Sequence, residues 1–141
     1  MKRILVALDD SERAPLVIDA ASRLAELAGA TLVLYQAIHV PAEVPSEVLV
    51  GHQSVEDVLV ARAHGSLEAL AGRVQSGRVE QIVTSLAIAW DGVCRTARER
   101  DVDLIVIGSH GYSGLDRVLG TTAAKVVNHA DRNVLVVRTL L

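Results

Sequence analysis

The sequence predicts an α/β protein whose one domain, residues 1–141, is an open parallel sheet of five strands with helices on both faces. A chain of 141 residues has room for about one domain. Half of its residues are apolar and its mean hydropathy is +0.35, which indicates that most elements bury one face. Short continuous aliphatic runs alternate with segments of helical period, and this alternation is typical of a parallel sheet covered on both sides.

The first aliphatic run, residues 4–8, predicts a strand buried on both faces, and it ends at a pair of acidic residues. A helix is expected next, with Ser11 as its N-cap, Pro15 in its first turn and Gly29 just past its end. Its apolar face is predicted to consist of Leu16, Ala20, Leu24 and Leu27. Because another aliphatic run follows at residues 31–35, this unit should be a right-handed crossover between parallel strands.

The remaining elements continue the alternation after a predicted mobile loop. Residues 38–53 contain Pro41 and Pro45 and have no sustained period, which is typical of a loop. Beyond it, the sequence predicts a helix over 55–74, a strand over 79–86, a helix carrying Trp90, Cys94 and Ala97, a strand over 103–107, a helix over 121–130 and a strand over 133–137. No helix is predicted to cover this last strand, so it should lie at a sheet edge, where exposed aliphatic strands favour pairing.

The composition excludes several classes of function. With no Phe, one Trp and two Tyr, the chain lacks the aromatic platforms on which many nucleic-acid-binding modules stack bases. Its net charge of −3 provides no general attraction to nucleic acid or to an anionic membrane, and no stretch approaches the roughly 18 apolar residues of a membrane span. The lone Cys94 cannot form an intramolecular disulfide and no signal-type apolar run opens the sequence, which predicts a cytoplasmic protein.

Two turns after predicted strands are candidates for ligand binding, because ligands of open α/β sheets bind beyond the carboxyl ends of the strands. One turn contains Asp9 and Asp10. The other, residues 108–114, is rich in glycine and is followed by Gly120 and Thr121 at the start of a helix. Glycines let backbone N–H groups approach an anion and a helix N-terminus adds unpaired donors, so the pattern favours a phosphate site. The alternative is that these glycines only turn the chain and begin a helix.

Other chemistry receives little support. Neither Gly-x-x-x-x-Gly-Lys-Ser/Thr nor Gly-x-Gly-x-x-Gly at the first helix is present, so a phosphate site would be of another type. The five histidines lack metal-ligand spacing, and no resident metal is predicted. His110, between two glycines, is a candidate to bind a phosphate or is a solvated loop residue. No serine has an assignable base, so no hydrolase triad is expected. Trp90 and Cys94 lie one helical turn apart on an apolar face, which favours packing.

Three stretches of the chain resemble the universal stress protein family: ILVALDDSE near the start, LIVIGSHGYSGLDRVLGTTAAKVV, and NHADRNVLVVR near the end. The resemblance covers nearly the whole chain. It implies a Rossmann-like fold of the adenine nucleotide alpha hydrolase type with strand order 3-2-1-4-5. Nucleotide-binding members resemble the pattern Gly-x-x-Gly, nine residues, then Gly-Ser/Thr. By this resemblance, the nucleotide-binding residues are Ala7, Asp9, Ala37, Gly108, Ser109, His110, Gly111, Gly120, Thr121 and Thr122.

The resemblance also implies roles and partners. The backbone of Ala7 and Ala37 would face adenine, Asp9 would hold ribose or a metal-bound water, and the glycine-rich segments would line the ribose and phosphates. ATP is the implied ligand, and any Mg²⁺ would arrive with it near Asp9. A homodimer through residues 134–141 and an unidentified regulatory protein are the implied partners. No catalytic residue is assigned, so any ATPase activity should be slow or absent.

The interval between Gly111 and Gly120 departs from the family pattern. It holds eight residues, 112–119, where the pattern has nine. One residue changes the reach of a chain by up to about 3.5 Å, which is comparable to a hydrogen-bond length. Two hypotheses result: a cytoplasmic stress-response protein whose ATP occupancy alters partner recognition through residues 38–53, or an ATP-independent dimeric interaction module in which the shorter loop closes the pocket.

Overall fold

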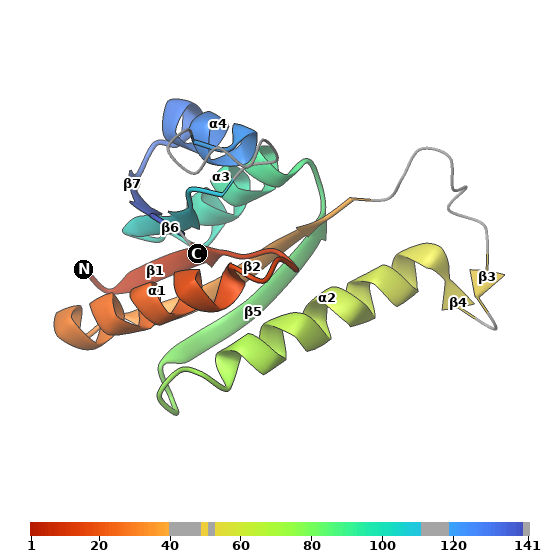
Figure 1. The fold of residues 1–141 in the computed structure, drawn as a ribbon, viewed down its shortest axis with the longest axis horizontal. Coiled ribbons are helices and arrows are strands. Elements are labelled where there is room, and N and C mark those ends of the chain that lie inside the picture. Colours follow the sequence, from red (N-terminus) through yellow and green to blue (C-terminus); the bar gives the residue numbers. More distant parts are fainter. Residues whose placement is uncertain (40–48, 51–52, 111–118, 140–141) are drawn as a thin grey trace.

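The computed structural model describes residues 1–39, 49–50, 53–110 and 119–139. The strands of its main sheet are β1 (Arg3–Ala7), β2 (Thr31–Ile38), β5 (Val79–Leu86), β6 (Leu104–Gly108) and β7 (Asn133–Val137). All pair in parallel, in the order β5-β2-β1-β6-β7 (Figure 1). Numbered along the chain within this sheet, the order is 3-2-1-4-5, which confirms the predicted fold class and strand order.

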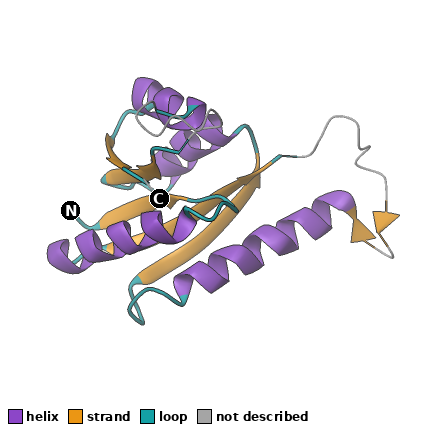
Figure 2. Ribbon diagram, viewed as in Figure 1, coloured by secondary structure: helices purple, strands orange, loops and turns teal. Residues whose placement is uncertain are grey.

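Helices cover both faces of the sheet. They are α1 (Ala14–Ala28), α2 (Val55–Ala71), α3 (Ala89–Glu99) and α4 (Thr121–His129). The helices α1 and α2 pack on one face, and α3 and α4 pack on the other (Figures 1 and 2). Among the described residues, no helix is both long and apolar enough to cross a membrane.

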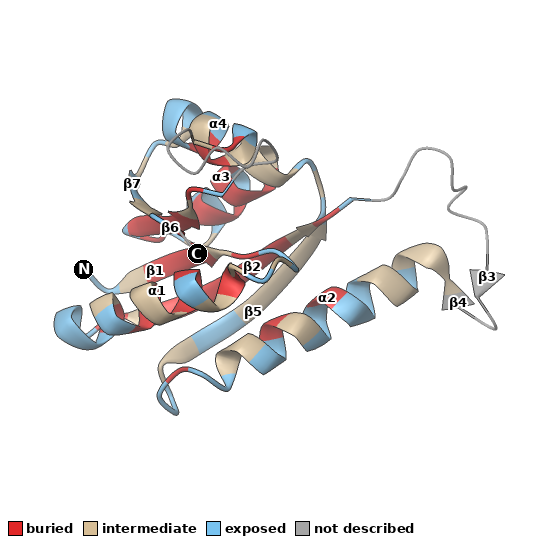
Figure 3. Ribbon diagram, viewed as in Figure 1, coloured by how far each residue is buried: buried red, intermediate tan, exposed pale blue. Residues whose placement is uncertain are grey.

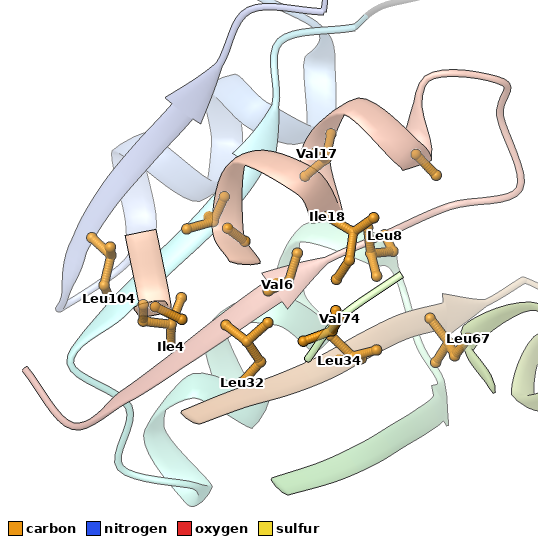
Figure 4. Close-up of a cluster of buried hydrophobic side chains, with 14 of the residues drawn as sticks. Ile4, Val6, Leu8, Val17, Ile18, Leu32, Leu34, Leu67, Val74 and Leu104 are labelled. Atoms are coloured by element: carbon orange, nitrogen blue, oxygen red, sulfur yellow. The ribbon is translucent and has the colours of Figure 1, made fainter. Parts of the chain in front are cut away.

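The two faces of the sheet form two hydrophobic clusters, because successive strand residues point to opposite sides. Ile4 and Val6 of β1 face α1 and α2, whereas Leu5 between them faces α3 and α4. All three are fully buried. The first cluster also contains Leu34 of β2 and Ile18 of α1 (Figure 4), and buried positions concentrate along the central strands (Figure 3). The continuous aliphatic runs are therefore strands buried on both faces, as predicted.

The buried face of α1 differs from the predicted one. Leu27 is 85% exposed and Leu16 is 37% exposed, while Leu24 is only partly buried against the first cluster. The buried residues of α1 are Ala14, Val17, Ile18, Ala21, Ser22 and Ala25. The prediction selected the largest side chains, but small alanines let the helix backbone approach the sheet closely, and this turns the leucines away from the sheet.

The start of α1 also differs from the prediction, whereas its end agrees. Ser11 is not the N-cap: the helix begins two residues later, with Arg13 at the N-cap position and no side-chain cap. Ser11 instead forms a turn before the helix, in which its carbonyl accepts the Ala14 N–H at 3.2 Å. Pro15 lies in the first turn, and Gly29 ends the helix with a φ of +67°, a left-handed conformation that glycine adopts at low cost.

Residues 38–53, predicted as a loop, contain two short strands. Leu49–Val50 (β3) and Gln53–Ser54 (β4) pair in antiparallel fashion, and β2 extends to Ile38. Strands of two residues are too short to produce a visible sequence period, so the prediction could not detect them. Residues 40–48 and 51–52 lie outside the described part of the chain. The mobility predicted for this loop therefore stays a prediction.

A carboxylate at the amino-terminal edge of the sheet links the start of β6 to the start of β1 through hydrogen bonds. Asp103, just before β6, accepts hydrogen bonds from the backbone N–H groups of Lys2 at 2.6 Å and Arg3 at 2.9 Å. These backbone bonds lower the pKa of the Asp103 carboxyl. Its folded pKa therefore lies below that of the unfolded chain, which is about 4. The stabilisation is present above that pH and is lost as the pH falls through the folded pKa.

We expect Asp103→Asn to lower the urea midpoint at pH 7, because the amide accepts these bonds without a negative charge. The gap to the wild type should shrink as the pH is lowered below about 4, where the wild-type carboxylate becomes protonated. Urea unfolding at pH 7 and pH 3 measures both values. Glu26→Gln, at an exposed carboxylate on α1, is the charge-matched control and should keep the same gap at both pH values. A gap for Asp103→Asn that does not change with pH contradicts this account.

Candidate functional site

A cavity of about 390 Å³ opens at the carboxyl ends of β1, β2 and β6. This is the edge of the sheet at which both candidate turns were predicted to lie, and the volume is typical of small-molecule sites. The cavity is lined by Ala7, Leu8, Asp9, Ser11, Arg13, Ala14, Val17, Tyr35, Ala37, Ala89, Val93, Ile107, Gly108, His110, Thr121, Thr122 and Ala123. The sheet and all helices except α2 contribute to it.

The structure brings most of the predicted site residues together around this cavity. Those that line it are Ala7, Asp9, Ala37, Gly108, His110, Thr121 and Thr122. Ser109 and Gly120 are buried next to the cavity without lining it, and Gly111 lies outside the described residues. The sequence analysis missed Arg13 and the apolar wall from α3. Arg13 follows the first strand closely enough to have been found, but the contribution of α3 depends on tertiary packing.

Ser109 holds the start of α4 in place. It is only 3% exposed, and its N–H donates to the carbonyl of Val137 at 2.8 Å. Its Oγ accepts the N–H of Thr139 at 3.2 Å, and its carbonyl accepts the N–H of Gly120 at 3.1 Å. One residue thus joins the ends of β6 and β7 to the N-cap of α4, so its geometry is that of a positioning residue.

The N-terminus of α4 lies at the cavity. Its first residues Thr121, Thr122 and Ala123 all line the cavity, and N–H groups in a first helical turn have no intrahelical acceptor. Gly120 at the N-cap supplies no side chain, and the first turn carries no acidic residue. A partial positive charge and donors without an intrahelical acceptor at this end are suited to an anion.

The N-terminus of α2, which does not line the cavity, differs from that of α4. Ser54 caps it by accepting the N–H of Asp57 at 3.1 Å, and Glu56 and Asp57 place negative charge in the first turn. The protein therefore neutralises the N-terminus of α2 with its own side chains. The contrast makes the uncapped start of α4 a distinctive feature of the cavity.

The N-terminus of α1 also lines the cavity, but its backbone donors are occupied. The Ala14 N–H donates to Ser11, and the N–H groups of Leu16 and Val17 both donate to the carbonyl of Arg13. Pro15 has no N–H. On this side of the cavity, the charged lining residues are Arg13 and Asp9. Asp9 Oδ1 accepts the Ser11 N–H at 3.0 Å.

Part of the cavity lining is apolar. Ala7, Ala37 and Ala89 supply small side chains, with Val93 and Ile107 beside them. Small residues at the strand ends leave room for a flat ring to lie against the backbone. A cavity lined both by small apolar side chains and by a helix N-terminus can accept a ligand that has both a ring system and an anionic group.

Tyr35 forms part of this wall and is fully buried. Its hydroxyl is hydrogen-bonded to Ser85 Oγ at 2.5 Å, and burial raises the pKa of the phenol. Its ring leans against Gly92 of α3 so closely that a Cβ at that position would overlap the hydroxyl oxygen. The tyrosine is therefore neutral and fixed at ordinary pH.

The remaining residues singled out in the sequence have packing roles. Cys94 is buried in the second cluster, and burial raises the pKa of its thiol, which disfavours the reactive thiolate. Trp90 packs against the same cluster and lies 4.5 Å from the His129 ring, measured between centroids. Within the described residues, no group of His, Cys, Asp or Glu side chains is arranged to hold a metal ion.

Together, the fold and the cavity define an open, doubly wound α/β protein with a cavity at the carboxyl edge of its parallel sheet, where ligands of such sheets bind. Comparison with known proteins gives its family. The model of the universal stress protein family matches residues 1–138, and the chain belongs to this family of stress-response proteins. The resemblance seen in the sequence motifs is thereby confirmed.

Relatives and solved structures agree with this assignment. Universal stress protein A homolog 1 of Coxiella burnetii is 33% identical over 138 residues, which cover 96% of this chain and 95% of that protein. The solved structure of universal stress protein UspA from Lactobacillus plantarum has 25% identity and a TM-score of 0.73, with 97% of each chain covered. A universal stress protein solved in complex with cAMP has 21% identity and a TM-score of 0.72, and covers 99% of this chain and 98% of its own; at this identity the likeness concerns the fold.

Proposed function

We propose that this protein is a stress-response regulator that binds ATP in the cavity between the loops after β1 and β6. The observation that carries the proposal is the N-terminus of α4, whose first residues line the cavity with neither a side-chain cap at Gly120 nor an acidic residue in the first turn. Such a helix end attracts phosphate. The cAMP bound to a universal stress protein of the same fold supports a nucleotide as the ligand.

The proposed orientation follows from the polarity of the cavity. Adenine lies against the backbone of Ala7 and Ala37, in the apolar part of the lining. Asp9, which also lines the cavity, accepts a ribose hydroxyl or a water of a magnesium ion that arrives with the nucleotide. The phosphates lie against Gly108, His110 and the first turn of α4.

Ser109 and Gly120 position this phosphate region without lining it, because the hydrogen bond from the Gly120 N–H to the Ser109 carbonyl fixes where α4 begins. Gly111, which the sequence analysis assigned to the same region, lies outside the described residues.

Hydrolysis is proposed to be slow or absent. Asp9 is the one carboxylate among the described lining residues, and its Oδ1 already accepts the Ser11 N–H. Efficient phosphoryl transfer to water needs a group that orients the water and cations that stabilise the transferred phosphoryl group. The same proposal includes a signalling role, in which binding of ATP in the cavity alters how residues 38–53 contact a regulatory partner. Most of that segment lies outside the described residues.

Two measurements on the purified wild-type protein test the proposal. Protein freshly purified without added nucleotide is denatured, and the released small molecules are identified by mass spectrometry. Emptied protein is then melted with and without 1 mM Mg-ATP. A ligand present at 100 times its Kd stabilises the fold by about 2.7 kcal/mol, so the Tm should rise by several degrees. Absence of both a released nucleotide and a Tm shift would favour the ATP-independent alternative.

A homodimer through residues 134–141 is part of the proposal. The observation that favours it is the position of β7 at the edge of the sheet, with Leu135 40% exposed. Unpaired edge strands readily pair with another strand. Light scattering at micromolar concentration should give twice the chain mass of 15.0 kDa, and Leu135→Lys should give the mass of one chain. A wild-type mass of one chain contradicts the dimer.

A further inference from the structure

One flank of α4 is apolar and faces the edge of the sheet. This helix packs between α3 and the edge strand β7 (Figure 1). On the side of α3, the Trp90 ring lies 4.5 Å from the His129 ring and 5.9 Å from Lys125 Nζ, measured from ring centroids. Val127 is two residues from each of these α4 residues, about 200° around the helix, so it faces away from α3 and towards β7. It is 45% exposed, and Ala124 lies one turn earlier on the same flank.

The strand β7 continues this apolar surface at the edge of the sheet. Val134 and Val136 are only partly buried against the cluster beneath α3 and α4, and Leu135 between them is 40% exposed. Among the described strands, none pairs with the outer side of β7. We call these five uncharged residues, Ala124, Val127, Val134, Leu135 and Val136, the edge surface.

A second copy of this chain is the partner that the edge surface fits. An unpaired strand accepts another strand, but β7 has only five residues, and a stable interface usually has about 20–30 residues on each side. The flank of α4 supplies part of the area that the strand lacks. Because a two-fold arrangement sets a surface against itself, the uncharged edge surface meets an uncharged surface and no like charges are buried.

The charges at the two ends of β7 favour an antiparallel arrangement. Before the strand, the carboxylates of Asp101 and Asp131 share one guanidinium, that of Arg132, through hydrogen bonds of 3.1 and 2.7 Å. These three groups carry a net charge of about −1 at neutral pH. After the strand, Arg138 is exposed. Antiparallel pairing places each acidic end beside Arg138 of the other copy, whereas parallel pairing places like charges together.

We infer that two copies of this chain associate in an antiparallel, two-fold arrangement in which the outer flanks of their α4 helices pack against each other through Ala124 and Val127. This inference rests on the homodimer of the proposed function, which named residues 134–141 alone. It adds a helix outside that segment, two contact residues and the orientation of the two copies. The small side chain of Ala124 allows the helices to approach closely.

Sedimentation velocity over a dilution series of the full chain tests the contact between the helices. Val127→Glu should raise the dimer Kd by about tenfold or more, because it brings two carboxylates together in a contact that excludes water. Val60→Glu is the matched control, since Val60 of α2 is also an exposed helical valine, at 37%; its dimer Kd should equal that of the wild type. Urea unfolding at concentrations below the dimer Kd should be alike for both variants, which checks the fold.

The orientation is tested by a charge reversal. Arg138→Glu places a negative charge beside the acidic end of the other copy, so it should weaken the dimer several-fold at low salt. The difference from the wild type should shrink at high salt, where the charges are screened. Arg23→Glu, at an exposed position of α1, is the control and should leave the dimer Kd unchanged. Equal dimer Kd values for Arg138→Glu and the wild type at low salt contradict the antiparallel arrangement.

Cross-linking with a short bis-maleimide gives a second readout of the contact. Val127→Cys should yield linked dimers, whereas Val60→Cys and the wild type, whose Cys94 is buried, should not. If Val127→Glu dimerises as tightly as the wild type while Leu135→Lys has the mass of one chain, the inference is overturned and the homodimer through β7 stands. A wild-type chain that remains monomeric at micromolar concentration overturns the proposed homodimer itself, and this inference with it.

Discussion

Gly92→Ala is expected to destabilise the protein by about 2 kcal/mol, although alanine is the better helix former. Gly92 lies in α3, and a Cβ there would overlap the Tyr35 hydroxyl and lie 3.1 Å from Tyr35 Cζ. The ring is fully buried and its hydroxyl is bonded to Ser85, so the tyrosine has little freedom to move. Overpacking of this kind costs about 1–3 kcal/mol and outweighs a helix-propensity gain of at most about 1 kcal/mol.

Gly65→Ala is the matched control for this substitution. Gly65 lies in α2 with no atom within 4 Å of the added Cβ, so the same change should stabilise the protein by about 0.5–1 kcal/mol. Urea unfolding of both variants gives the comparison. Adding Tyr35→Phe to Gly92→Ala removes the overlapping oxygen and should restore part of the lost stability, which would appear as non-additivity. Equal stabilities for Gly92→Ala and Gly65→Ala would contradict the packing described here.

Thr121→Pro is expected to weaken ATP binding by about tenfold or more while leaving the fold intact. Thr121 is the first residue of α4 and lines the cavity, and an N–H at this position has no intrahelical acceptor. Proline is accepted at this position and removes only that donor. Gly120 before it has φ −61° and ψ 158°, the extended conformation that a residue before proline prefers. A hydrogen bond to a charged group contributes about 1.5–3 kcal/mol, which corresponds to tenfold or more in affinity.

Thr121→Ala separates the backbone donor from the side chain. It removes the hydroxyl but keeps the N–H, so the difference in ATP affinity between the proline and alanine variants measures the contribution of the donor. Calorimetric titrations of both variants, with thermal melts of the empty proteins, provide the data. If the proline and alanine variants bind ATP equally well, the start of α4 does not hold the phosphates.

The sequence predicted the strands well because their signal is local. A run such as residues 4–8 is continuous and aliphatic, and a strand in the middle of a covered sheet requires this pattern. The buried face of α1 was predicted incorrectly. Whether the face rich in alanine or the face rich in leucine is buried depends on how closely the helix approaches the sheet. Leu27, a large apolar residue, is consequently 85% exposed.

The same distinction applies to the candidate site. Residues directly after β1 and β6, such as Asp9 and His110, could be located because the carboxyl edge of a parallel sheet is a general place for ligands. That Ser109 points away from the cavity and binds β7 could not be predicted, because this depends on how the chain returns after β7.

Calorimetric titration of emptied wild-type protein with Mg-ATP tests the central claim most directly. If the start of α4 and the loop after β1 form a phosphate-binding site, the titration should show saturable heat with one site per chain and a Kd in the micromolar range or tighter. No heat up to millimolar ATP would contradict the claim, and the function would then have to lie on the surface of the protein.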